Sequence, residues 1–225
     1  MRNFTLIFIG TFLISNTTFG QLTKEITNPD ISGKLFKNSG RASLKIEGSP
    51  YLQKNYTSAK VTKINTLASM RYNVYRDEFE FISPKNDTLV LDKINDFSDL
   101  TILATNTKYQ LVNYINENGK INYGYLIDLY QKGDFGLYKK ENVLLSEEKI
   151  AKTSMEQNMP PKYFKSSDIY YLKNKITISE FPSNKKKLIK VFPEKKETIE
   201  TFLKENKIDF DKEADKIKII DFLSQ

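Results

Sequence analysis

Cysteine and histidine are both absent from the 225 residues of this chain, and so is tryptophan. Without cysteine there is no disulfide, no thiolate metal site, no cysteine nucleophile and no lipid-modified cysteine. Without histidine, the commonest general base and the commonest transition-metal ligand are missing. Catalysis would have to use carboxylates, lysine, tyrosine, serine or threonine, a set that still permits glycoside hydrolysis by two carboxylates.

Motifs for nucleotides, metals and nucleic acids are missing as well. The sequence contains no GxGxxG, Walker A or HExxH pattern and no EF-hand loop. The net charge is +7, but the lysines alternate with acidic residues, which favours a solvated surface over contact with an acidic polymer. We therefore predict no cofactor, no metal and no nucleic-acid partner.

The first 20 residues have the pattern of a secretory signal peptide. A positive start is followed by the apolar run 4–14, which is too short to span a membrane. Small residues precede the bond between Gly20 and Gln21, the predicted cleavage site. This pattern predicts export to the periplasm, the cell surface or the medium, with a polar segment over 21–42. No later apolar run is long enough for a membrane span.

Residues 43–181 alternate apolar and polar side chains in short runs, which predicts an antiparallel β domain. Asn118-Gly119 and Lys132-Gly133-Asp134 are the clearest turn signals. Short connections favour a strongly twisted meander, curled towards a partial barrel. The run between the two turns places five residues on one face, directed to the core or a ligand: Ile121, Tyr123, Tyr125, Ile127 and Leu129.

The run 71–82 changes its apolar face near Arg76-Asp77. Tyr72 and Val74 would lie on one face of a strand, and the aromatic residues that follow would lie on the other. Either a β-bulge or a tight turn explains this change. The bulge is favoured, because neither Arg76 nor Asp77 is the glycine or asparagine that a tight hairpin prefers.

Residues 182–225 change to a helical period and predict helices packed on the sheet, so the fold class is α+β. Ser183 and Asp211 are the expected N-caps of the first and last helices, and Pro193 suits the first turn of the middle one. The connection 146–167 is polar and without clear periodicity. It is a linker, a lid or a further helix.

Tyrosine is abundant in the predicted sheet, and its ring combines a flat apolar face with a hydroxyl group. That combination suits sugars, peptides and protein partners, although tyrosine also fits half-buried pleated surfaces. The relevant tyrosines are Tyr72, Tyr75, Tyr109, Tyr114, Tyr123, Tyr125, Tyr130 and Tyr138. Five of them are nominated as binding residues: Tyr72, Tyr75, Tyr123, Tyr125 and Tyr130.

The leading functional hypothesis is a non-enzymatic envelope protein that binds a partner protein, a glycan or another ligand through this Tyr-rich sheet. A hydrolase with paired carboxylates and a structural envelope component are the alternatives. A deep cleft with two carboxylates about 5–9 Å apart would favour the hydrolase. No residue is nominated as catalytic.

Several short motifs are spread over most of the chain that would remain after cleavage. They are Gly48-Ser-Pro-Tyr-Leu52, Arg71-Tyr-Asn-x-Tyr75 with Glu80-Phe81, Gly124-Tyr125, Asp168-x-Tyr-Tyr-Leu172 and Phe192-Pro193. Together they resemble a group of exported, sheet-rich proteins of the Bacteroidota whose function is unknown. This resemblance implies export to the periplasm or cell surface, and it implies no activity and no functional residue.

Overall fold

The computed structural model describes residues 36–38, 46–83, 85–149, 151, 153, 155 and 159–225. The predicted leader and its cleavage site at Gly20-Gln21 lie outside these residues. The strands are β1 (Phe36–Asn38), β2 (Thr57–Val61), β3 (Thr66–Asn73), β4 (Glu78–Ile82), β5 (Thr88–Leu91), β6 (Asp99–Ile102), β7 (Thr107–Ile115), β8 (Ile121–Lys132), β9 (Phe135–Ser146), β10 (Lys162–Asn174) and β11 (Thr177–Glu180). The helices are α3 (Lys185–Val191), α4 (Lys196–Asn206) and α5 (Glu213–Leu223), with 3-10 turns at Asn95–Phe97 and Pro193–Lys195.

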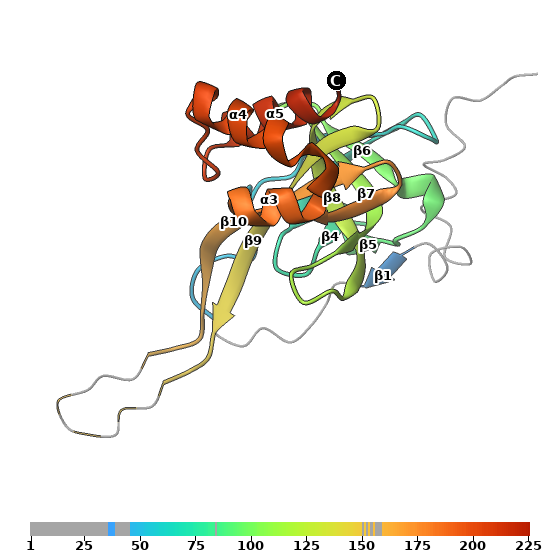
Figure 1. Ribbon diagram of the computed structural model, residues 1–225. Helices are drawn as coiled ribbons and strands as arrows, with labels where there is room; N and C mark the ends of the chain where they lie inside the picture. The colour runs from blue at the N-terminus through green and yellow to red at the C-terminus, as the bar shows by residue number, and fades with distance from the viewer. Residues whose placement is uncertain are drawn as a thin grey trace, which may run out of the picture.

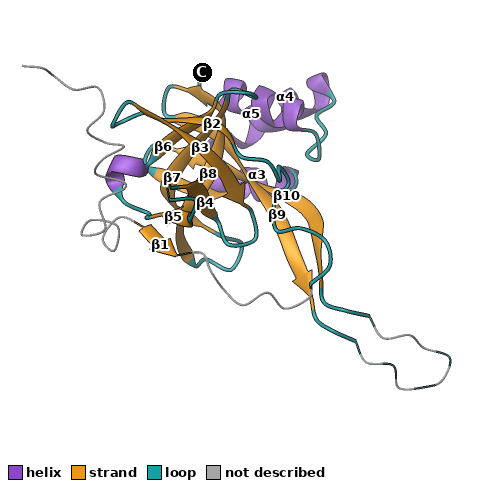
Figure 2. Cartoon of the chain, turned by 180° about the vertical axis from the view of Figure 1, so that it is seen from behind, coloured by secondary structure: helices purple, strands orange, loops and turns teal. Residues whose placement is uncertain are grey.

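These strands form one sheet in the order β1-β5-β4-β3-β2-β6-β7-β11-β10-β9-β8. All pairings are antiparallel except that of β7 with β11, which meet in parallel at Ile115 and Ser179. Because β7 also pairs with β8, the strands from β7 to β11 close a partial ring. The α-helices lie together against one side of the sheet, and the β9–β10 hairpin extends away from the body (Figures 1 and 2). The predicted α+β class is confirmed.

The turn between β3 and β4 overturns one sequence prediction. The two strands form an antiparallel hairpin in which Tyr72 pairs with Phe79, so no continuous bulged strand exists. Asp77 takes the left-handed conformation at φ 57°, which lets the chain reverse. Tyr72, Val74 and Phe79 all become buried in the same core, because the reversal brings both apolar faces to one side.

Strand β8 also differs from the expected one-sided pattern. Ile121 is 67% exposed and Tyr123 is 46% exposed, whereas Tyr125 and Ile127 are buried. Leu126 on the opposite face is fully buried too. The physical reason is the ring of strands: the middle of β8 is covered on both faces, while its first residues pair with β7 alone.

Three buried clusters hold the molecule together. One lies where the β2–β6 part of the sheet faces β7 and β8, a second lies inside the ring, and the third lies under the helices. In the third cluster, β9 and β10 contribute Leu137 and Leu172, and the helices contribute Leu188, Ile199 and Ile220. Each such side chain, fully buried, contributes about 1.5–3 kcal/mol, so the helices are an integral part of the fold.

Two predicted helix caps are displaced by one residue. Asn184, not Ser183, caps α3, because its Oδ1 accepts a hydrogen bond from the Lys187 N–H at 3.0 Å. The N-cap position of α5 is Lys212, which makes no side-chain cap, so Asp211 does not cap that helix. Pro193 begins the 3-10 turn that leads into α4, as the sequence predicts.

The connection 146–167 is shorter than expected. Strand β9 continues to Ser146 and β10 already begins at Lys162, with a further antiparallel bridge between Lys149 and Met159. The described part of the connection therefore prolongs a hairpin.

Candidate functional site

A cavity of about 570 Å³ lies beside the largest core cluster. Its volume is within the roughly 300–1,000 Å³ of small-molecule sites in proteins. Strand β9 lines it with the alternating residues Lys139 and Glu141, and β8 lines it with the consecutive residues Ile127, Asp128 and Leu129, beside an irregularity in the β8–β9 register. The wall combines apolar, aromatic and charged groups from β3, the β6–β7 turn, β7, β8 and β9: Val74, Ile102, Ile127, Leu129, Tyr72, Tyr109, Arg71, Asn106, Asp128, Lys139 and Glu141.

Glu141 is the most perturbed acid in this wall. Burial raises the pKa of its carboxyl group, and the charge of Asp168 on the neighbouring strand raises it further. Lys139, Lys165 and a hydrogen bond with Tyr109 oppose this rise, but burial is the largest contribution. Burial also raises the pKa of Tyr109, as does Glu141. The cavity therefore contains a carboxyl group that takes up a proton more readily than an exposed glutamate does.

Replacing Glu141 by glutamine should raise the midpoint of thermal unfolding at pH 7. The pKa of Glu141 is above its usual value of 4.5 in the folded chain, so its contribution to stability is full below that value and is lost as the pH rises through the raised pKa. The glutamine side chain stays neutral and can still accept a hydrogen bond from Tyr109. The pH dependence of thermal unfolding measures this effect.

Glu148→Gln, at an exposed carboxylate, is the matched control and should follow the wild type. If the midpoint of thermal unfolding changed with pH in parallel for Glu141→Gln and the wild type, the assignment of a raised pKa to Glu141 would be contradicted.

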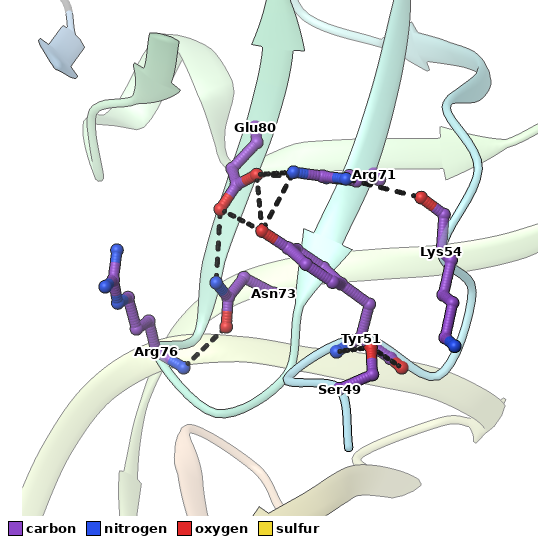
Figure 3. Close-up of polar contacts among 7 residues, drawn as sticks. All are labelled: Ser49, Tyr51, Lys54, Arg71, Asn73, Arg76 and Glu80. Carbon is purple, nitrogen blue, oxygen red and sulfur yellow. Dashed lines mark hydrogen bonds and ion pairs between the residues drawn. The ribbon is translucent and has the colours of Figure 1, made fainter. Parts of the chain in front are cut away.

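Arg71, on the cavity wall, is bound by a buried acid (Figure 3). Arg71 and Glu80 are cross-strand partners, and the guanidinium donates to Glu80 Oε2 at 2.8 and 3.0 Å. Glu80 also accepts from the Tyr51 hydroxyl at 2.9 Å and from the Asn73 amide at 3.1 Å. The guanidinium lies over the rings of Tyr51 and Tyr56, at 3.9 and 4.5 Å from their centroids. This network fixes the segment around Tyr51 to β3 and β4.

Burial, followed by the hydrogen bond to Glu80, raises the pKa of Tyr51 to about 12. The Tyr51 hydroxyl is therefore a stable donor to Glu80 across the physiological pH range. Since Arg71 and Glu80 neutralise each other, Arg71 shapes the wall of the cavity and is not a free cation for a ligand.

A second polar centre forms around Asp77 at the β3–β4 turn. Its carboxylate accepts hydrogen bonds from the Tyr72 hydroxyl at 2.5 Å, from the Tyr125 backbone N–H at 3.1 Å and from Lys93 Nζ at 2.6 Å. Lys140 Nζ lies 3.4 Å from the same carboxylate. Tyr72 therefore uses its hydroxyl within the protein and offers only its ring to the cavity.

The structure separates the five nominated tyrosines. Tyr72 and Tyr125 meet in the core with ring centroids 6.5 Å apart, and the Tyr125 hydroxyl donates to the Phe97 carbonyl. Tyr75 is exposed and lies against Tyr163, with ring centroids 5.1 Å apart. Tyr123 is exposed on β8, and Tyr130 donates its hydroxyl to Asp221 of α5. Of the five, only Tyr72 lines the cavity.

Sequence reasoning missed the charged residues of this site. Tyr109 belongs to the set of sheet tyrosines but was not nominated, and Glu141 and Lys139 carried no signal in a chain so rich in charge. Lys139 is held by Glu213 of α5, with 3.2 Å between Nζ and Oε2. Across the described residues, no three or more acidic side chains come together in a way that could hold a metal ion.

No known protein family, curated protein or solved structure matches this chain. The resemblance to exported proteins of the Bacteroidota therefore stays a prediction. Among the helices that the structure describes, none has the length and apolar character needed to cross a membrane.

Proposed function

We propose that this chain is an exported, non-enzymatic protein of the bacterial envelope that binds a neutral sugar in the cavity beside β3, β8 and β9. The cavity and its mixed wall carry this proposal. A sugar ring has C–H faces and a rim of hydroxyl groups. Ile127 and Leu129 suit the faces, while Asn106, Asp128 and Glu141 suit the hydroxyl groups. The leader pattern over 1–20 is the basis for export.

A carboxylate-dependent hydrolase is the second candidate, and one observation favours it. Glu141, whose pKa is raised by burial, shares the cavity wall with a second carboxylate, Asp128. Glycosidases use one protonated and one ionised carboxyl group across the scissile bond. Binding without turnover distinguishes the leading proposal from this one: a hydrolase would cleave the bound sugar and lose cleavage, but not binding, in Glu141→Gln.

The test is sugar binding by the protein isolated from the cell envelope, where cleavage after Gly20 should leave Gln21 as the first residue. Maltose, cellobiose and chitobiose are each titrated into the protein, and their binding is followed by saturation-transfer NMR. Ala104 is exposed at the cavity entrance, so Ala104→Trp should obstruct it and weaken binding about tenfold or more.

Ile176→Trp is the matched control, because Ile176 is exposed in the β10–β11 turn away from the cavity. That variant should bind as the wild type does. Absence of binding by all three disaccharides at millimolar concentration would overturn the proposed ligand class, and equal loss in both tryptophan variants would overturn the proposed site.

A further inference from the structure

A second cavity lies between β10 and the beginning of α5, and its wall includes Asp168, whose charge also acts on Glu141 of the first cavity. Its volume is also about 570 Å³. The β9–β10 register shifts between Ser166 and Ile169, and this irregularity turns residues of β10 towards the cavity. The wall comes from the β10 irregularity, the chain entering α3 and the turn before α5, and it includes Ser166, Asp168, Tyr170, Glu180, Asp211 and Lys216.

Lys216 of α5 is a buried cation in this wall. Lys216 is only 6% exposed, and its Nζ atom lies 4.2 Å from the centroid of the Tyr170 ring. Its ammonium group has no hydrogen bond or ion pair with any residue that the structure describes. Buried ammonium groups normally donate hydrogen bonds, because leaving such donors unpaired in a desolvated position is costly. An aromatic face attracts the charge but does not replace an acceptor oxygen.

Three acids of this turn act on Lys216: two of them are engaged elsewhere, and the third, Asp211, makes no hydrogen bond or ion pair with it. Glu213 accepts from Lys139 Nζ at 3.2 Å and from the Tyr170 hydroxyl at 3.0 Å. Asp209 pairs with Lys212 at 3.5 Å. Desolvation lowers the pKa of Lys216, although these acids and Asp211 oppose that change. None of these acids accepts a hydrogen bond from the Lys216 ammonium group, and an anion that enters the cavity would do so.

Asp168, which also lines this cavity, has a carboxylate oxygen without a hydrogen bond. Its Oδ1 atom is buried and has no hydrogen-bond partner among the described residues. The Lys165 Nζ atom lies 3.7 Å from it, beyond hydrogen-bonding distance, on a side chain that is mostly exposed. An entering ammonium or hydroxyl donor would satisfy this carboxylate, and an ammonium group would also neutralise its charge.

We propose that this second cavity binds a short peptide with free termini, whose carboxylate contacts Lys216 and whose ammonium group contacts Asp168. A zwitterion matches an ammonium group and a carboxylate oxygen that both lack hydrogen bonds, and it leaves the net charge of the cavity unchanged. A phosphate dianion fits less well, because Asp168, Glu180 and Asp211 would repel it. The site is separate from the proposed sugar cavity and does not depend on it.

The test measures binding of the dipeptide Ala-Ala by isothermal titration calorimetry to the full mature chain. N-acetyl-Ala-Ala lacks the ammonium group and Ala-Ala-amide lacks the carboxylate, so each should bind about tenfold more weakly or worse. Lys216→Met should bind Ala-Ala as weakly as the wild type binds the amide, and should no longer distinguish the two. Asp168→Asn should lose the distinction between Ala-Ala and its acetylated form in the same way.

Lys204→Met, at an exposed lysine of α4, is the control and should bind as the wild type does. Lys216→Met should unfold at the wild-type temperature or above it, since it removes an unpaired buried charge. Ala104→Trp should leave peptide binding unchanged, which separates this proposal from sugar binding. The proposal fails if the wild type binds no Ala-Ala, if it binds all three peptides equally, or if Lys216→Met retains full affinity.

Discussion

Replacing Arg71 by alanine should lower the free energy of unfolding by about 3–5 kcal/mol, because it leaves a buried carboxylate without its countercharge. Glu80 is only 2% exposed, and Arg71 provides two of its hydrogen bonds. The Tyr51 hydroxyl and the Asn73 amide remain, but they are neutral donors and cannot offset the charge. Urea denaturation of the protein measures the change.

Replacing the partner residue, Glu80, by glutamine should lower the free energy of unfolding by less. Glu80→Gln keeps acceptor capacity for Tyr51, and the guanidinium that it leaves behind is 22% exposed and can gain water. We expect a loss of about 1–2 kcal/mol. Arg71→Ala combined with Glu80→Gln should then be less destabilising than the sum of the two single changes, because the double variant no longer holds an unpaired charge.

The matched control is an ion pair at the surface. Lys185 Nζ lies 3.0 Å from Glu200 Oε1, but both side chains are well exposed. Lys185→Ala should therefore change stability by no more than about 0.5 kcal/mol. If Arg71→Ala proved as mild as Lys185→Ala, the network around Glu80 would be a surface feature and not a structural centre.

The strands could be predicted where the signal is local. The Asn118-Gly119 turn and the alternating run after it were predicted where the structure has the β7–β8 turn and β8, and Gly119 does take the left-handed conformation at φ 74°. At the β3–β4 turn a bulge was favoured over the tight turn, because Asp77 is neither glycine nor asparagine. Its conformation is held by Lys93 and by the backbone of Tyr125, which are 16 and 48 residues later in the chain.

The candidate site was less predictable than the fold. The pKa of Glu141 is raised first by burial and then by the charge of Asp168, and both depend on how β9 packs and pairs with β10, which cannot be read from either segment alone. The nominated Tyr72 and Tyr125 were expected on a binding face, but the packing of the β2–β6 part of the sheet against β7 and β8 buries them. Their hydroxyl groups meet Asp77 and the Phe97 carbonyl instead of a ligand. Partners distant in sequence therefore decide which polar residues are available.

Replacing Gly124 by alanine should destabilise the chain by about 2–4 kcal/mol, through a clash and through the loss of charged hydrogen bonds. A Cβ atom at Gly124 would lie 2.1 Å from Asp77 Oδ2 and 3.1 Å from its Cγ. Asp77 cannot move freely, because it is held by Tyr72, Lys93 and the Tyr125 backbone. Thermal and urea unfolding measure the loss.

Gly136→Ala is the control for this effect, since Gly136 also lies within a strand and has no positive φ. Its Cβ would lie 2.3 Å from Gln131 Oε1, the end of an exposed and flexible side chain that can turn aside. We expect a change of no more than about 1 kcal/mol, because alanine also restricts the unfolded chain.

Measuring Gly124→Ala a second time, in an Asp77→Gly variant, distinguishes a clash with Asp77 from a general intolerance of alanine in β8. Asp77→Gly removes the obstructing carboxylate, and glycine readily adopts the φ of 57° found at that position. In that background Gly124→Ala should cost about 1 kcal/mol or less, because nothing is left for the new methyl group to displace. An equal cost in both backgrounds would show that the methyl group clashes with something other than Asp77, and that Gly124 is not required by the polar centre at the β3–β4 turn.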